Sequence, residues 1–355
     1  MSKTSVEGKK DRLLRLGREQ EVRLKEELSS QENRSYARAA AYANAALRYY
    51  TAAGDSKKIK ELKAKALKYR QLSASELTQT LPPISADIQK VVNDEICLVI
   101  KKCTSFDTLN ECLDYLARLS SLVPNYGEIA KHASEHLPLT SILANHTVMD
   151  SEGHLISDDD EENYWTYHHY DLEMQVYIYE IAGVFQKLRL EKDLNNVTMM
   201  DYVLSKGILG SEECVKLQSA FANHFIVGDN IAAVHILSPT IEGLIISLSR
   251  RLGIDVVDVV AQDRGRITSR DISLGTNNIT SESFTNVWGE NFCRMIDYLL
   301  YNNFGPKLRH RTAHGSISIK ECNDTSVVIL LYILIKILNL VRITKTSTSE
   351  PQDDK

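Results

Sequence analysis

A short segment near the C-terminal end of this 355-residue chain holds the densest group of side chains that could do chemistry. In order, it reads Lys307, Leu308, Arg309, His310, Arg311, Thr312, Ala313, His314 and Gly315. Arginine can donate paired hydrogen bonds to phosphate oxygens, and histidine can take or give a proton near neutral pH. Together these groups could cleave RNA without a metal, because an imidazole can remove the 2′-hydroxyl proton while a guanidinium stabilises the charge developing on the phosphate.

We therefore take Arg309, His310 and His314 as candidate catalytic residues. Lys307 and Arg311 are candidate substrate-binding residues. The alternative is that these side chains cap helix ends or form surface ion pairs, as cations near a helix C-terminus often do.

Spacing limits how the motif could work. Positions five apart on an ideal helix point about 140° away from each other, so Arg309 and His314 share a face only where the backbone is irregular. The preceding Gly305-Pro306 favours such irregularity. A two-fold dimer could also bring two copies of the motif together.

A second candidate pair lies earlier in the chain. His235 and Glu242 are seven residues apart, which places them two turns apart on one helix face. They could orient the motif from a neighbouring helix as a supporting layer. The alternative is a buried polar pair that sets the helix register.

Other polar clusters give weaker signals. His168-His169 could suggest metal binding, but adjacent residues point to different faces of a helix, which favours an exposed turn. The acidic run 158–162 has neither a glycine turn nor spaced ligands, which favours a solvated loop. No Walker, Rossmann or Gly-x-Ser-x-Gly motif occurs. We predict no metal and no cofactor.

The elements that must position these residues are predicted to be almost entirely helical. Sparse proline and glycine, alanine-rich stretches and helical periodicity indicate an all-α fold, with one small β-hairpin around 263–265. The expected helices cover 11–30, 34–53, 56–72, 85–103, 105–121, 164–190, 212–227, 230–252, 281–304 and 325–343, with another short helix between Pro124 and Pro138. Thr104 and Asp107 have the spacing of a capping box for the helix over 105–121. The apolar run 327–343 is shorter than the about 20 residues that span a bilayer, so it is predicted to be a buried helix.

Composition shifts divide the chain into five parts. Residues 1–80 form a basic helical region whose Gly54-Asp55 turn resembles a tetratricopeptide-type hairpin, and residues 81–145 connect it to the rest. Residues 146–162 are an acidic linker, 163–345 the main helical domain and 346–355 a disordered tail.

Charge and cysteine usage indicate where the protein works. Residues 1–72 hold 18 Lys/Arg against 9 Asp/Glu, although the chain as a whole has a net charge of -5. This basic surface is either a set of solvated helix faces or a docking surface for RNA or an acidic protein partner. The six cysteines show neither zinc-site nor disulfide spacing, and the N-terminus is no secretory signal. We expect a cytoplasmic protein that does not bind membranes.

The Arg-polar-x-x-x-His pattern just before a last apolar helix resembles the signature of HEPN domains (higher eukaryotes and prokaryotes nucleotide-binding). The C-terminal half is most similar to a HEPN-like bacterial and eukaryotic family with an Arg-Asn-x-x-x-His-Gly signature. Residues 225–242 match that family's Gly-Asp-x-x-x-Ala-x-His-x-Leu-x-Pro-x-x-Glu pattern. The resemblance covers about residues 165–345, and the basic hairpin resembles a segment that often precedes this domain. One departure is His310, where the family usually has asparagine.

The resemblance implies a bundle of four or five helices that forms a homodimer, with the Arg-His motifs lining a shared cleft. It also implies a metal-independent endoribonuclease, used in bacterial defence or stress. By analogy, Arg309 would contact the scissile phosphate and His314 would be the acid-base residue. Other HEPN domains have lost activity and serve as scaffolds or protein-interaction modules, and this is the alternative function.

Overall fold

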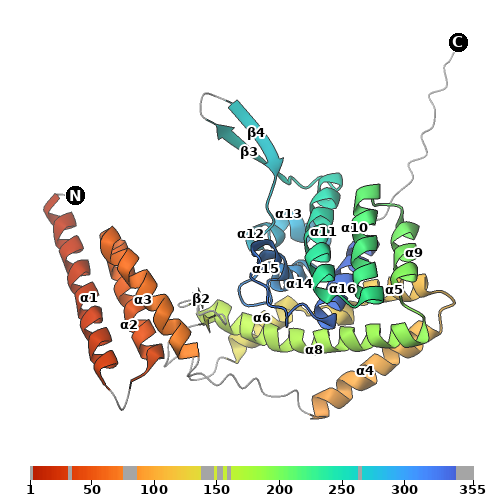
Figure 1. Cartoon of the computed structure of the whole chain (residues 1–355), viewed down its shortest axis with the longest axis horizontal. Helices are drawn as coiled ribbons and strands as arrows, with labels where there is room; N and C mark the ends of the chain where they lie inside the picture. Colours follow the sequence, from red (N-terminus) through yellow and green to blue (C-terminus); the bar gives the residue numbers. More distant parts are fainter. Residues whose placement is uncertain are drawn as a thin grey trace. The chain divides into compact units, whose positions relative to one another are not determined.

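The computed structural model describes residues 3–30, 34–74, 86–136, 148–149, 155–157, 161–262 and 266–340 (Figure 1). The chain divides into two compact units. The smaller comprises Met1–Pro83 with Pro138–Tyr164, and the larger comprises Ile84–Leu137 with Trp165–Lys355. The predicted all-α architecture is confirmed.

Among its described residues, the smaller unit is built on three helices, α1 (Lys3–Ser29), α2 (Tyr36–Ala53) and α3 (Ser56–Ala74). α2 packs against both neighbours, and the buried alanines Ala39 and Ala43 let the helices approach closely. Tyr50 of α2 and Lys58 of α3 both donate hydrogen bonds of 2.7 Å to Glu21 of α1, which joins the three helices. Gly54 ends α2 in the left-handed conformation, as predicted. A short strand pair, β1 (Val148–Met149) and β2 (Leu155–Ser157), also belongs to this unit.

As far as the structure describes it, the larger unit contains the remaining helices and one hairpin (Figure 1). Its first half comprises α4 (Ala86–Thr104), α5 (Leu109–Arg118), the 3₁₀ turn η1 (Ser120–Leu122), α6 (Tyr126–Glu135), α8 (Glu161–Glu191), α9 (Asn196–Lys206), α10 (Ser211–Ala222) and the π-helical turn η2 (Asn223–Val227). Its second half comprises α11 (Asn230–Arg251), β3 (Val257–Gln262), β4 (Arg266–Asp271), α12 (Thr276–Ile279), α13 (Glu282–Trp288), α14 (Glu290–Leu300), α15 (Leu308–His314) and α16 (Asp324–Leu340). The region 81–145, expected to be a connection, thus contributes α4 to α6 to this unit's core.

The centre of this core is α16. Every residue from Val327 to Leu338 is buried, and the helix packs on α5, α9 and α11. The predicted buried apolar helix is therefore confirmed over the described part of its range. The expected hairpin is also confirmed: β3 and β4 are antiparallel, with Val257 opposite Asp271 and Gln262 opposite Arg266.

Two local predictions were wrong. The helix expected over 281–304 is broken, because Gly289 has a φ of 85° and separates α13 from α14. The capping box expected at Thr104 is also absent, since Thr104 ends α4 and its hydroxyl donates to the carbonyl of Lys101. The capping box that starts α5 is formed instead by Thr108 and Glu111.

One described helix, α11, is long and apolar enough to cross a membrane by length and composition alone. In the most apolar 18-residue stretch of α11, 56% is buried inside the protein, as in a core helix of a globular protein. The residues 158–160 of the acidic run and the tail 346–355 lie outside the described residues.

Candidate functional site

The motif forms a regular helix. α15 runs from Leu308, which is buried, to His314, and Gly315 ends it with a φ of 64°. It packs against α11 and α14 (Figure 1). A Cβ at Gly305 would meet the backbone oxygen of Tyr298 at 1.9 Å, so glycine is required for the chain to pass this close to α14. The irregularity expected within the motif is absent, and Arg309 and His314 point to different sides of the helix.

Arg309 is held against α11. Its Nε donates to Oε2 of Glu242, which is 7% exposed. The Arg309 side chain retains 24% exposure, and among the described residues its two Nη groups have no hydrogen-bond partner. The structure thus brings together one pair of predicted site residues that lie 67 positions apart in sequence.

His310 and His314 form the second pair. They lie one turn apart on the same face of α15, both are exposed, and their ring centroids are 4.5 Å apart. Partial burial lowers the pKa of His310, and the neighbouring Lys307 and His314 lower it further. The neutral form of His310 is therefore favoured, as a proton acceptor requires.

Arg311 is engaged elsewhere. Its Nη1 and Nη2 donate to the two carboxylate oxygens of Glu321, the second at 2.7 Å, and Nη2 also donates to the carbonyl of Ser316 at 3.3 Å. Glu321 in turn accepts bonds from Ser318. This network closes the loop after Gly315, so Arg311 has a structural role that accounts for its position.

The remaining predicted residue of α11 stays apart from the motif. His235 is exposed, and its Nδ1 is bonded to the carbonyl of Ile231 at 2.9 Å. Ser238, closer to α15, accepts a 3.3 Å bond from Thr312 instead. Of the two α11 residues predicted to support the motif, Glu242 contacts it directly and His235 forms no described bond to it.

Tyr301 is a neighbour that sequence reasoning missed. It is 9% exposed, and its hydroxyl has no hydrogen-bond partner among the described residues. Burial raises its pKa well above the usual value, and the charge of Glu242 adds to this effect. The carboxylate of Glu242 thus contacts the Arg309 guanidinium and also acts electrostatically on the buried Tyr301 hydroxyl. No spacing in the sequence signals this, since Tyr301 follows α14.

A second missed cluster surrounds the π-helical turn. His224 is buried, and its Nδ1 lies 2.7 Å from Oδ1 of Asn230 while its Nε2 is bonded to Arg189. Arg189 also donates to Asp324, at 3.0 Å. Burial lowers the pKa of His224, so this imidazole favours the neutral form. The cluster ties α8, α11 and α16 together at a turn that no local sequence pattern predicts.

Four histidines meet between α6 and α8. The rings of His132 and His136 stack at 4.3 Å, His132 lies 5.3 Å from His169, and His168 lies 6.0 Å from His169. Burial and the neighbouring imidazoles lower the pKa of His169. Within the described part of the chain, no three His, Cys, Asp or Glu side chains are arranged to hold a metal ion.

Comparison of this chain with models of known protein families, with curated proteins and with solved structures finds no match.

Proposed function

We propose that this protein is a metal-independent endoribonuclease that acts as a homodimer through α15. The observation that carries the proposal is the pair of exposed imidazoles, His310 and His314, on one face of that helix. Acid-base cleavage of RNA needs one neutral and one protonated group at the scissile phosphate. In a dimer, the two copies of α15 would supply such groups, one histidine from each copy, beside the cationic Lys307 and Arg309.

In the proposed reaction, neutral His310 accepts the proton of a 2′-hydroxyl. The 2′-oxygen attacks the adjacent phosphorus, and the bond from phosphorus to the 5′-oxygen breaks. A protonated histidine, His314, gives its proton to that leaving oxygen. The products are a 2′,3′-cyclic phosphate and a 5′-hydroxyl, so no water or metal is consumed in this step.

The 4.5 Å separation of the two rings leaves no room for a phosphate between them. The proposal therefore assigns the base to one protomer and the acid to its partner, across a two-fold axis. Arg309 would present its two free Nη groups to the phosphate, with Glu242 holding the side chain in place. Arg311 has no part in this mechanism, because Glu321 occupies its guanidinium.

A second candidate function is a non-catalytic scaffold or protein-interaction module. The observation that favours it is that both motif arginines are paired with carboxylates, Arg309 with Glu242 and Arg311 with Glu321. Such pairs fix α15 against α11 and close the following loop without any substrate. In this case the basic three-helix unit would bind the partner.

The test is cleavage of varied RNAs in EDTA by the wild type and by the variants His310→Ala, His314→Ala and Arg309→Ala. His168→Ala, an exposed histidine on α8, is the matched control. We expect the wild type and control to cleave and leave cyclic phosphate ends, and each motif variant to lose at least about 100-fold in rate. Circular dichroism establishes that each variant is folded.

Mixing provides the sharper experiment. If base and acid come from different protomers, mixed dimers of His310→Ala and His314→Ala contain one intact pair and regain activity. Absence of cleavage by the folded wild type across all RNAs would favour the scaffold. Equal cleavage by the wild type and the motif variants would remove this motif from the chemistry.

A further inference from the structure

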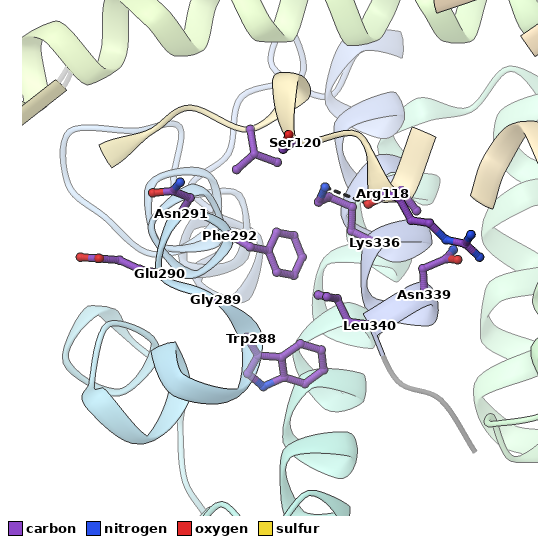
Figure 2. Close-up of a pocket in the computed structure, with 12 residues that line it drawn as sticks. Arg118, Ser120, Trp288, Gly289, Glu290, Asn291, Phe292, Lys336, Asn339 and Leu340 are labelled. Carbon is purple, nitrogen blue, oxygen red and sulfur yellow. Dashed lines mark hydrogen bonds between the residues drawn. The ribbon is translucent and has the colours of Figure 1, made fainter. Parts of the chain in front are cut away.

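A cavity of about 530 Å³ opens between α5, η1, α14 and α16 of the larger unit. Its apolar walls come from Ala117, Val123, Trp288, Phe292 and Leu340 (Figure 2). No residue of the α15 motif lines it. The size and the apolar lining are those of a site for a small organic molecule.

A single buried cation lies at this cavity. Lys336 of α16 is 7% exposed, although it stands among the apolar residues of the central helix. Its ammonium donates to the carbonyl of Ala117 at 2.9 Å and, more weakly, to that of Leu119 at 3.5 Å. Both carbonyls lie at the C-terminal end of α5, where the helix dipole favours a positive charge.

These contacts leave the charge of Lys336 unbalanced. An ammonium has three N–H donors, and the described acceptors use two of them. Both acceptors are neutral carbonyls, and Lys336 forms no ion pair among the described residues. Glu290 is the one carboxylate of the lining, and Figure 2 shows it extending away from Lys336. Arg118 lies at the rim with its side chain 63% exposed, and its guanidinium is paired with Asp114 at 3.7 Å.

The aromatic rings complete the site. Phe292 lies beside the ammonium, with 5.9 Å between Nζ and the ring centroid, and Trp288 forms the neighbouring wall (Figure 2). Trp288 is held in place because its Nε1 donates to Ser249 at 2.9 Å. A molecule in this cavity would therefore meet a fixed apolar surface on one side and an unbalanced cation on the other.

We propose that this cavity binds an organic carboxylate, with its anionic head on Lys336 and its apolar body against Trp288, Phe292 and Leu340. A charge-assisted bond to the free ammonium proton would stabilise the head. A neutral molecule of the same shape would lack this bond, and an amine would be repelled. The inference is independent of the ribonuclease proposal, since it uses different residues and requires no catalysis.

The test uses three probes with the same tail, which are octanoate, octanol and octylamine. The chain has two tryptophans, so Trp165→Phe leaves Trp288 as the sole fluorescent reporter, on the wall of the cavity. Titration followed by Trp288 emission and by calorimetry should give an octanoate affinity at least about tenfold above that of octanol, a difference of about 1.4 kcal/mol. Octylamine should bind more weakly than octanol.

Substitutions then distinguish the contribution of the carboxylate head to binding from that of the alkyl tail. Lys336→Met should reduce octanoate affinity to that of octanol, whereas Lys320→Met, the same change at an exposed lysine, should leave the preference intact. Leu340→Phe should weaken both probes by filling the cavity, and Leu204→Phe, on an exposed part of α9, should weaken neither.

Equal affinity for octanoate and octanol would overturn the proposal. So would octanoate binding that survives Leu340→Phe unchanged, because the ligand would then lie elsewhere. If Lys336→Met fails to fold, two measurements still test the proposal. One is the comparison of the three probes in the Trp165→Phe protein, and the other is the comparison of Leu340→Phe with its control Leu204→Phe.

Discussion

Arg309 and Lys336 are two cations of the same helical unit that are held by different kinds of acceptor. Arg309 is bonded to the carboxylate of Glu242, which cancels its charge, and 24% of its side chain stays exposed. Lys336 is 7% exposed and is bonded to neutral carbonyls, which stabilise its position without cancelling its charge. One cation is therefore neutralised within the protein, whereas the other keeps its positive charge beside the cavity.

The largest effect should come from the glycine that lets the chain approach α14 before the motif. Gly305→Ala should lower the free energy of unfolding by at least about 3 kcal/mol, because the new Cβ would collide with the Tyr298 backbone oxygen. Urea unfolding measures this loss. Gly243→Ala on α11 is the control, since nothing lies within 4 Å of its Cβ, and it should leave stability unchanged or slightly higher. Equal effects of the two changes would contradict the close approach.

The burial of Lys336 should make the free energy of unfolding depend on pH. Burial lowers its pKa from 10.5 to about 8, so between these values the unfolded chain binds more protons than the folded one. Stability relative to Lys336→Met should therefore rise with pH across this window, by about 3 kcal/mol in total. Urea unfolding of both proteins between pH 7.5 and 10.5 measures the difference. The titration of buried tyrosines contributes equally to both proteins and therefore cancels in the comparison. A difference that stays constant would mean that Lys336 is as well solvated as a surface lysine.

Glu242→Gln should destabilise the protein, because Arg309, unlike Lys336, depends on a carboxylate partner. Removing the carboxylate charge leaves Arg309 partly buried without its counter-ion, and we expect a loss of about 2 kcal/mol after allowing for its exposure. The double variant with Arg309→Met should recover part of this loss. Asp258→Asn is the control, because its partner Arg270 is 73% exposed, and this change should cost at most about 0.5 kcal/mol. Matching losses would show that the Arg309 pair is an ordinary surface contact.

The smallest effect concerns the histidines outside both sites. Burial lowers the pKa of His169 below 6.5, so on acidification the unfolded chain takes up its proton first and stability falls. Replacing His169 by glutamine should reduce the loss of stability between pH 7 and pH 5, whereas His168→Gln, at the exposed neighbour, should change it less. Thermal unfolding at several pH values measures both. An unchanged pH profile for His169→Gln would show that this imidazole is free to protonate in the folded protein.

The predicted elements held where the signal was local. Gly54 ends α2 in the left-handed conformation, as predicted, because glycine adopts a positive φ at little cost. The strands on either side of 263–265 also pair as predicted. Local patterns gave a wrong prediction where two nearby residues could both start the same helix. Thr104 has cap-like spacing, but Thr108 is followed by a glutamate at the third position and forms the complete box. Gly289 was expected within a helix and instead separates two.

Local sequence signals predicted the all-α fold and the burial of α16, because backbone preference and apolar periodicity act within a few turns. They did not predict that the motif itself forms the helix α15. Glu242 and Arg309 were candidate site residues from the sequence, and the packing of α15 on α11 brings them together across 67 positions. Tertiary packing alone placed Lys336 against a carbonyl 219 residues away and brought the Tyr301 hydroxyl under the influence of the Glu242 charge. Such pairs depend on which faces distant helices present to each other, and no local pattern of residues encodes that choice.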